Sequence, residues 1–202
     1  QVVIGITILC ILTGLAIMQL ATIRKFKADD QAYELTDVLG EARQNAIQQR
    51  RTFRVEINRT LGQITLINEN TEGTAGDDEI EKIVRLKDSV TVGEIPNNIA
   101  GAPTATSPIP VLEPVWSNYP LSNGSEKITL RFARSGLVLD TGINHIGTNS
   151  VMRGATIYVF TNRERTTMPE VIRAVTVLQA SGDTSILKCK FNETGRCGNW
   201  EK

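Results

Sequence analysis

The first 23 residues of this chain, from Gln1 to Ile23, carry no charged side chain, and the stretch from Arg24 to Arg51 is rich in charge but contains no proline. At about 1.5 Å per helical residue the uncharged part alone would span about 35 Å, enough to cross a hydrocarbon core of about 30 Å. A helix inside a water-soluble domain rarely has this composition. We therefore predict one helix of about fifty residues, apolar all round in its first half and amphipathic in its second.

The second half of this predicted helix has two distinct faces. Small and apolar residues recur at steps of three and four, which places them on one side of a helix. They are Ala28, Ala32, Leu35, Leu39, Ala42 and Ala46. The opposite face holds Asp30, Glu34, Asp37, Glu41 and Gln48. Because an isolated charged helix of this length is marginally stable in water, we expect the apolar stripe to pack on a sheet or a partner.

The uncharged segment does not read as a secretory signal peptide, because no basic residue precedes it and no small-residue cleavage site ends it. A basic cluster of Arg24, Lys25 and Lys27 follows it, and the positive-inside rule would place that cluster in the cytoplasm. The cysteines near the end of the chain favour the opposite orientation, which a more basic leader could set. The sequence leaves both orientations open.

Length and composition favour one anchor and one domain. About 150 of the 202 residues remain after the helix, the ordinary size of a single globular domain, so we divide the chain into residues 1–51 and residues 52–202. Lys plus Arg equals Asp plus Glu at 22 each, so no net charge attracts the protein to nucleic acid. Cys189 and Cys197 lie close together, and a disulfide between them is the simplest pairing, with two reduced thiols as the alternative. A disulfide would place the domain in an oxidising compartment.

Beyond Arg51 the periodicity changes to alternation, which predicts strands. A hairpin is expected at Phe53 to Leu66, with its turn at Leu61 and Gly62. Further strand-like runs are Ile80 to Val92, Ile128 to Phe132, Leu137 to Leu139, Ala155 to Phe160, Ile172 to Leu178 and Ser185 to Phe191. We predict an α+β fold in which the long helix packs on an antiparallel sheet or sandwich. The Pro-rich stretch 96–126, which contains Trp116 and Tyr119, is expected to be an interface loop or a solvated connection.

Catalysis has the least support in the sequence. His145 is the only histidine, which excludes multi-His metal sites, and no nucleophile elbow, phosphate loop or dinucleotide motif is present. The acidic run Asp77, Asp78, Glu79 and Glu81 lacks the ligand spacing of a calcium loop. We therefore expect a non-enzymatic protein with no metal and no cofactor.

The C-terminal part carries mixed charge. Its basic residues are Arg163, Arg165, Arg173, Lys188, Lys190, Arg196 and Lys202, interleaved with Glu164, Glu170, Asp183, Glu193 and Glu201. The small positive excess argues against nucleic acid as a partner. Candidate glycosylation positions are the N-x-Ser/Thr asparagines Asn58, Asn123 and Asn192, together with Thr104, Thr106 and Ser107 in the Pro-rich stretch.

Two segments resemble a known family. The start VVIGITILCILTGLAI, running without a break into an amphipathic helix and a β-rich domain, resembles the mature N-terminus of type IV pilins and pseudopilins. The stretch KITLRFARSGLVLDTGIN, from Lys127 to Asn144, is similar to the strand, Gly-containing turn and strand of the FimT/GspH pseudopilin subfamily, and so is LTDVLGEARQNAIQQRRTFRVEI. The resemblance covers the helix strongly and the domain moderately.

This resemblance implies a structural subunit of a type IV pilus-like filament or a type II secretion pseudopilus. The protein would be anchored in the inner membrane with its domain in the periplasm, and then assemble with copies of itself and other pilins into an extracellular filament or a periplasmic pseudopilus. The helices would pack in the filament core through Gln1, Val2, Val3, Ile4, Gly5, Ile6, Ile8, Leu9, Ile11, Leu12, Gly14, Leu15 and Ile17.

Two positions depart from the family pattern. Pilins carry a Glu at the fifth mature position that pairs with a neighbour's N-terminal amine, and alignment places Gln1 there unless four residues are missing upstream. Met18 stands where many pilins have a Pro, so any local unwinding would depend on Gly14.

A second function from another class fits the same sequence features. The chain could be a membrane-tethered periplasmic binding module, including a minor pilin that binds DNA, with the Pro-rich stretch or the cysteine loop as its contact surface. Removing residues 1–22 separates the two functions, because a binding module would keep its ligand and a filament subunit would lose assembly.

Overall fold

The structure, a computed structural model, describes residues 2–71, 76–93, 99, 102, 127–139, 154–162, 169–178, 181–191 and 197–202, with side chains in the first helix described from Phe26 onward. These residues form helix α1 (Val2–Gln49) and a series of strands. The strands are β1 (Thr52–Asn58), β2 (Gln63–Glu69), β3 (Glu79–Arg85), β4 (Val90–Gly93), β5 (Lys127–Phe132), β6 (Val138–Leu139), β7 (Gly154–Asn162), β8 (Pro169–Leu178), β9 (Thr184–Phe191) and β10 (Cys197–Glu201).

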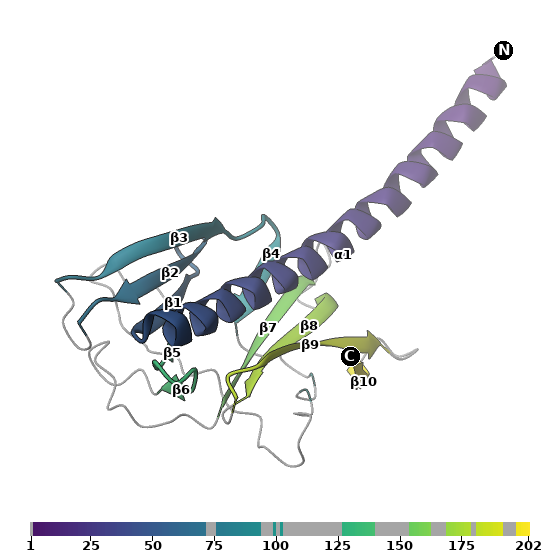
Figure 1. Ribbon diagram of the computed structural model, residues 1–202. Helices are drawn as coiled ribbons and strands as arrows, with labels where there is room; N and C mark the ends of the chain where they lie inside the picture. The colour runs from purple at the N-terminus through teal and green to yellow at the C-terminus, as the bar shows by residue number, and fades with distance from the viewer. Residues whose placement is uncertain are drawn as a thin grey trace.

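The strands form two antiparallel sheets. One sheet has the order β3-β2-β1-β5-β6, and the other has the order β10-β9-β8-β7-β4. In the first sheet, β1 pairs with β2 and with β5, so that Val55 lies opposite both Leu66 and Leu130. Figure 1 shows the C-terminal half of α1 lying across both sheets, while its N-terminal end extends away from them.

One hydrophobic core joins α1 to both sheets. Leu35 and Leu39 of α1 are fully buried against alternate residues of the strands, among them Val55 of β1, Ile157 of β7 and Val175 of β8. The helix ends where Arg50 adopts a left-handed φ of 55°, a common way to stop a helix, and β1 begins two residues later. The long helix on antiparallel sheets confirms the predicted α+β fold.

Two details of the strand prediction were wrong. The run Ile80 to Val92 is not one strand: β3 belongs to the first sheet and β4 to the second, and the chain turns between them at Lys87 to Ser89, where Ser89 has a φ of 69°. The short strand β10 was missed, because its sequence CGNWE lacks both alternation and β-branched residues.

Each sheet also has a second buried layer on the face away from α1. Beyond the first sheet lies a group of charged residues, and beyond the second lies a small hydrophobic cluster that includes Tyr158, Ile172 and the two cysteines of β9 and β10. Of the Pro-rich stretch 96–126, only Ile99 and Ala102 fall within the described residues, and both belong to this cluster.

Candidate assembly surface

The buried face of α1 matches the predicted stripe. Ala28, Ala32, Leu35, Leu39, Ala42 and Ala46 are all fully buried. The alanines have no side chain beyond Cβ, so the helix backbone can approach the strands closely, while the two leucines fill the space between the sheets. The helix is thereby docked with one side toward the core.

Ion pairs on both flanks of α1 fix how the helix is rotated about its own axis. On one flank Lys87 Nζ lies 2.8 Å from Asp30 and 2.7 Å from Glu34, and Lys82 Nζ lies 2.6 Å from Glu41. Hydrogen bonds to Asp30 and Glu34 raise the pKa of Lys87 above its ordinary value. On the other flank are the pairs Arg173–Asp29 and Arg43–Asp183. Exposed pairs contribute little stability each, but together they orient one face of α1 toward solvent.

That outward face carries a seven-residue repeat. Phe26, Tyr33 and Ile47 lie seven or fourteen residues apart and are 66%, 51% and 43% exposed. Asp30, Asp37 and Gln44 lie four residues after Phe26, Tyr33 and Gly40, and all three are exposed. Large apolar side chains at every seventh position form one of the two series by which helices pack side by side in a left-handed supercoil, and here the second series is polar. We refer to these seven residues, Phe26, Asp30, Tyr33, Asp37, Gly40, Gln44 and Ile47, as the outward stripe.

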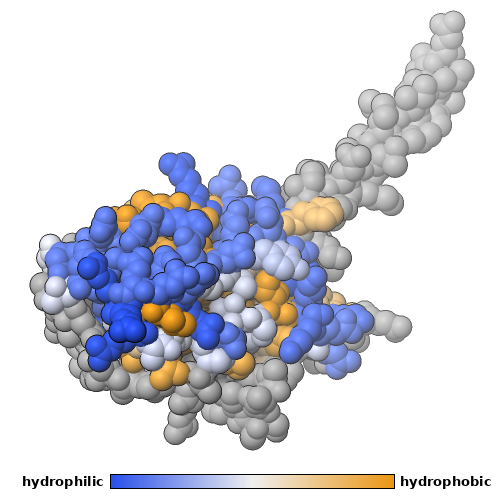
Figure 2. Space-filling model, viewed as in Figure 1, coloured by the Kyte–Doolittle hydropathy of each residue, from blue (hydrophilic) through white to orange (hydrophobic). Residues whose placement is uncertain are grey.

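Gly40 has no packing reason within the chain. A Cβ placed on it would meet nothing within 4 Å, and glycine inside a helix costs about 1 kcal/mol relative to alanine. A glycine in this position makes a gap in the outward stripe into which another element can approach. In Figure 2 hydrophobic patches are interspersed with hydrophilic ones on this side of the molecule.

The side chains of the predicted filament-core positions 1–17 lie outside the described residues, so their packing remains a prediction. The backbone of α1 is helical without interruption from Val2 to Gln49, including Gly14 and Met18. Among the residues whose side chains are described, no helix is both long and apolar enough to span a bilayer.

A buried ionic cluster on the first sheet was not anticipated from the sequence. Arg131 is fully buried, and its Nη2 lies 2.7 Å from Glu69, whose other oxygen accepts from Arg54 Nη1 at 2.7 Å. Arg54 also pairs with Glu56 and Asp78. Burial alone would lower the pKa of Arg54, but the charge of Glu56 and the hydrogen bonds to Asp78 and Glu69 outweigh it and raise the pKa. The sequence feature that could have indicated this cluster is an Arg in each of two neighbouring strands, TFRVEIN and KITLRF.

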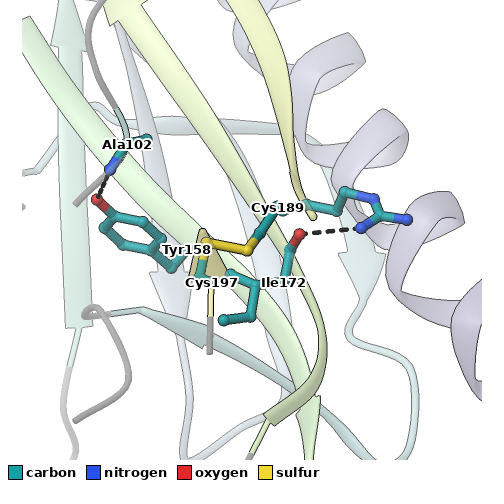
Figure 3. The surroundings of a disulfide bond; sticks show 6 residues. Ala102, Tyr158, Ile172, Cys189 and Cys197 are labelled. Atoms are coloured by element: carbon teal, nitrogen blue, oxygen red, sulfur yellow. Dashed lines mark hydrogen bonds between the residues drawn. A yellow bond between two sulfur atoms is a disulfide. The ribbon is translucent and has the colours of Figure 1, made fainter. Parts of the chain in front are cut away.

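The predicted disulfide between Cys189 and Cys197 is confirmed, and it links β9 to β10. Figure 3 shows it beside Tyr158 and Ile172, with the Ala102 N–H donating to the Tyr158 hydroxyl at 3.1 Å. The Tyr158 ring also lies 6.0 Å from that of Trp200 in β10. Burial raises the pKa of Tyr158, although the Ala102 hydrogen bond acts in the opposite direction. The disulfide and this tyrosine therefore fasten the last strand and part of the Pro-rich stretch to the second sheet.

Of the candidate glycosylation positions, only Asn58 lies within the described residues. Asn58 is buried in β1, where its Oδ1 accepts a hydrogen bond from the Leu61 N–H, so it is poorly placed to carry a glycan. Asn123, Asn192, Thr104, Thr106 and Ser107 lie outside the described residues, as does His145. Within the described part of the chain, no three His, Cys, Asp or Glu residues are grouped as metal ligands.

Comparisons with known proteins give the following. No family model matches the chain, and no curated protein matches it. Among solved structures it is similar to the minor pseudopilin EpsH from the Type 2 Secretion System of Vibrio cholerae, with 16% sequence identity and a TM-score of 0.46 over 80% of this chain and 97% of that chain. Similarity at this level assigns neither family nor function to this chain.

Proposed function

We propose that this chain is a non-enzymatic structural subunit of a type IV pilus-like filament or a type II secretion pseudopilus, and that it assembles through α1. The observation that carries the proposal is the outward stripe. One face of α1 is fully buried in its own domain, while the opposite face exposes Phe26 and Tyr33. Ile47 continues their heptad spacing and is 43% exposed, although its side chain also lies beside Gly136 of the domain. Side chains of this size in this repeat are suited to packing against other helices.

The uncharged first half of α1 extends the same helix beyond the domain. Residues 1–23 have no charge, so in this proposal they lie in the inner membrane before assembly and among the same segments of neighbouring subunits afterwards. When these helices move from lipid into a bundle, contacts with apolar lipid are replaced by contacts with apolar side chains, so little hydrophobic free energy is gained. Close packing of the helices at Gly5 and Gly14 would therefore favour the bundle. The β-domains would then form the outer surface of the polymer.

The disulfide supports a periplasmic or extracellular domain. Disulfides persist in oxidising compartments and are rare in the cytoplasm, and the Cys189–Cys197 bridge links two adjacent strands in the folded domain. Of the two orientations left open by the sequence, the disulfide therefore favours the one in which the domain lies outside the inner membrane.

The test is assembly by the full chain. Produced together with a type II secretion or type IV pilus assembly apparatus, it should appear in sheared filaments identified by electron microscopy and mass spectrometry. Tyr33→Ala, in the outward stripe, should reduce filament yield. Ile83→Ala removes an equally exposed apolar side chain from β3 and is the matched control, which should leave the yield unchanged. Protein that stays monomeric in the membrane under these conditions would contradict the proposal.

Two of the four described basic residues of the C-terminal part, Arg173 and Lys190, give the binding-module alternative no support. Arg173 is paired with Asp29 of α1, and Lys190 is paired with Glu201. Charges held in such pairs are poorly disposed to contact phosphates. The variant lacking residues 1–22 distinguishes the two functions. A filament subunit should lose assembly, whereas a binding module released from its tether would still bind a duplex DNA probe.

A further inference from the structure

The outward stripe has enough features to define how two copies of α1 align, if the chain assembles as proposed above. The stripe alternates two kinds of position at heptad spacing: Phe26, Tyr33, Gly40 and Ile47 in one series, and Asp30, Asp37 and Gln44 in the other. Subunits whose N-terminal segments all start in one membrane have their helices parallel. Parallel neighbours can then differ only in axial offset, and whole heptads keep the two series facing each other.

Small offsets are disfavoured by charge. With no offset, Asp30 and Asp37 of one copy lie level with the same residues of the next. With an offset of one heptad, Asp30 of one copy lies level with Asp37 of the other. Asp30 is paired with Lys87, but in both arrangements Asp37 lies level with another carboxylate, and like charges facing each other in an interface oppose association. Asp37 is exposed and has no ion-pair partner among the described residues.

An offset of two heptads removes this conflict and fills the gap at Gly40. It places Phe26 of one copy level with Gly40 of the other, Tyr33 with Ile47, and Asp30 with Gln44. Asp37 comes level with residue 51, where Arg50 and Arg51 end the helix and are both exposed. The most exposed apolar side chain of the stripe thus faces the one position with no side chain, and an acid faces two bases.

We propose that neighbouring copies of this chain pack their α1 helices in parallel with an axial offset of two heptads, about 21 Å, so that Phe26 of one copy occupies the gap at Gly40 of another. This offset gives Gly40 the role that no contact within the chain supplies. It goes beyond assembly itself, because it assigns which residues of two copies meet.

Cysteine crosslinking of assembled full-length chains measures the offset. In a Cys10→Ala background, the double variant Phe26→Cys with Gly40→Cys should give a ladder of linked chains with a short bis-maleimide. Tyr33→Cys with Gly40→Cys reports a one-heptad offset and should not link. Gly40→Cys alone should not form dimers. Dimers of this single variant would indicate helices that are antiparallel or not shifted. Links in either control instead of the first variant would overturn the offset while leaving filament assembly intact. Absence of filaments from the unmodified chain would overturn both.

A size exchange gives an independent measurement. A Cβ at position 40 meets nothing within 4 Å, so Gly40→Phe should leave the fold unchanged by circular dichroism. Filament yield should nevertheless fall about tenfold, because two large side chains would compete for one gap. In the double variant Gly40→Phe with Phe26→Ala, the large side chain stands at position 40 and the small one at position 26 of the neighbouring copy. This exchange should restore most of the yield. If the double variant assembles no better than Gly40→Phe alone, the pairing is wrong.

Discussion

The carbonyl oxygen of Gly136 occupies the space that a Cβ on Gly182 would need. Gly136 lies in the turn between β5 and β6 of the first sheet, and Gly182 lies in the turn between β8 and β9 of the second, so these two glycines bring the two sheets into contact beside α1. Both have positive φ, 82° and 67°, and side chains of Arg43 and Ile47 lie against them. The glycine turn that resembles the FimT/GspH pattern thus has a packing role in this chain.

Gly182→Ala should therefore destabilise the domain strongly. It adds a left-handed backbone cost of about 1–2 kcal/mol to a clash with the backbone of the other sheet. Gly62→Ala is the matched control, since Gly62 has a φ of 61° but open space around its Cβ, and it should show only the backbone cost. Urea unfolding measures both. Equal losses of unfolding free energy in the two variants would show that the turns at Gly136 and Gly182 separate at little cost.

The buried ionic cluster should depend on its complete set of partners. Glu69→Gln leaves Arg54 and Arg131 without the carboxylate they share, and breaking a buried pair typically costs about 3–5 kcal/mol. Glu41→Gln, which removes the exposed partner of Lys82, should cost less than about 1 kcal/mol. Equilibrium unfolding of the two variants compares them, and similar small effects would indicate that water compensates both arginines.

Tyr158 should make the domain sensitive to alkali. Its pKa is raised above 10.0, mainly by burial, so the folded state disfavours the phenolate. The sign follows: its contribution to stability is complete below pH 10 and is lost as pH rises through the raised pKa. Tyr158→Phe should lower stability at pH 7, because the Ala102 N–H loses its acceptor, yet reduce the slope of stability against pH above 10. Thermal unfolding across pH 8 to 11 tests this, and an unchanged slope would contradict it.

Reduction of the disulfide should loosen the C-terminal strand. For residues separated by eight positions, loop entropy gives a stabilisation of roughly 2–3 kcal/mol. The double variant Cys189→Ser with Cys197→Ser should lose about this amount, and hydrogen exchange should rise first in β10. Exchange in β1, in the other sheet, provides the internal reference and should change little. A uniform rise across both sheets would mean that β10 is not a separate unit of stability.

The sequence predicted the helix and most strands because their signals are local. The stripe from Ala28 to Ala46 could be read from spacing alone, and alternation identified β1, β2 and β5. The buried charges of Arg54 and Arg131 could not be identified in this way, because alternate polar positions in a strand ordinarily face water. In the structure both faces of β1 are buried, and Arg54 and Arg131 are removed from solvent.

The division at Lys87 to Ser89 shows the same limit at an element boundary. Apolar residues recur from Ile80 to Val92 and suggest a strand-like run, although Lys87 to Ser89 interrupt them. Nothing local says that the two halves belong to different sheets. In the structure Gln31 of α1 accepts the Lys87 N–H through its side chain at 2.7 Å, so a residue 56 positions away satisfies the backbone where the chain changes sheet. Such a long-range hydrogen bond leaves no trace in local periodicity.

The position of α1 across both sheets also has a mechanical meaning. A pull on its N-terminal end, directed along the helix, would load the buried alanine and leucine contacts and the ion pairs on both flanks simultaneously, in shear. A force directed outward from the sheets would separate the same contacts one after another. We therefore expect the domain to hold its helix best against tension along the helix axis, the direction in which a subunit anchored by its N-terminal segment would be pulled.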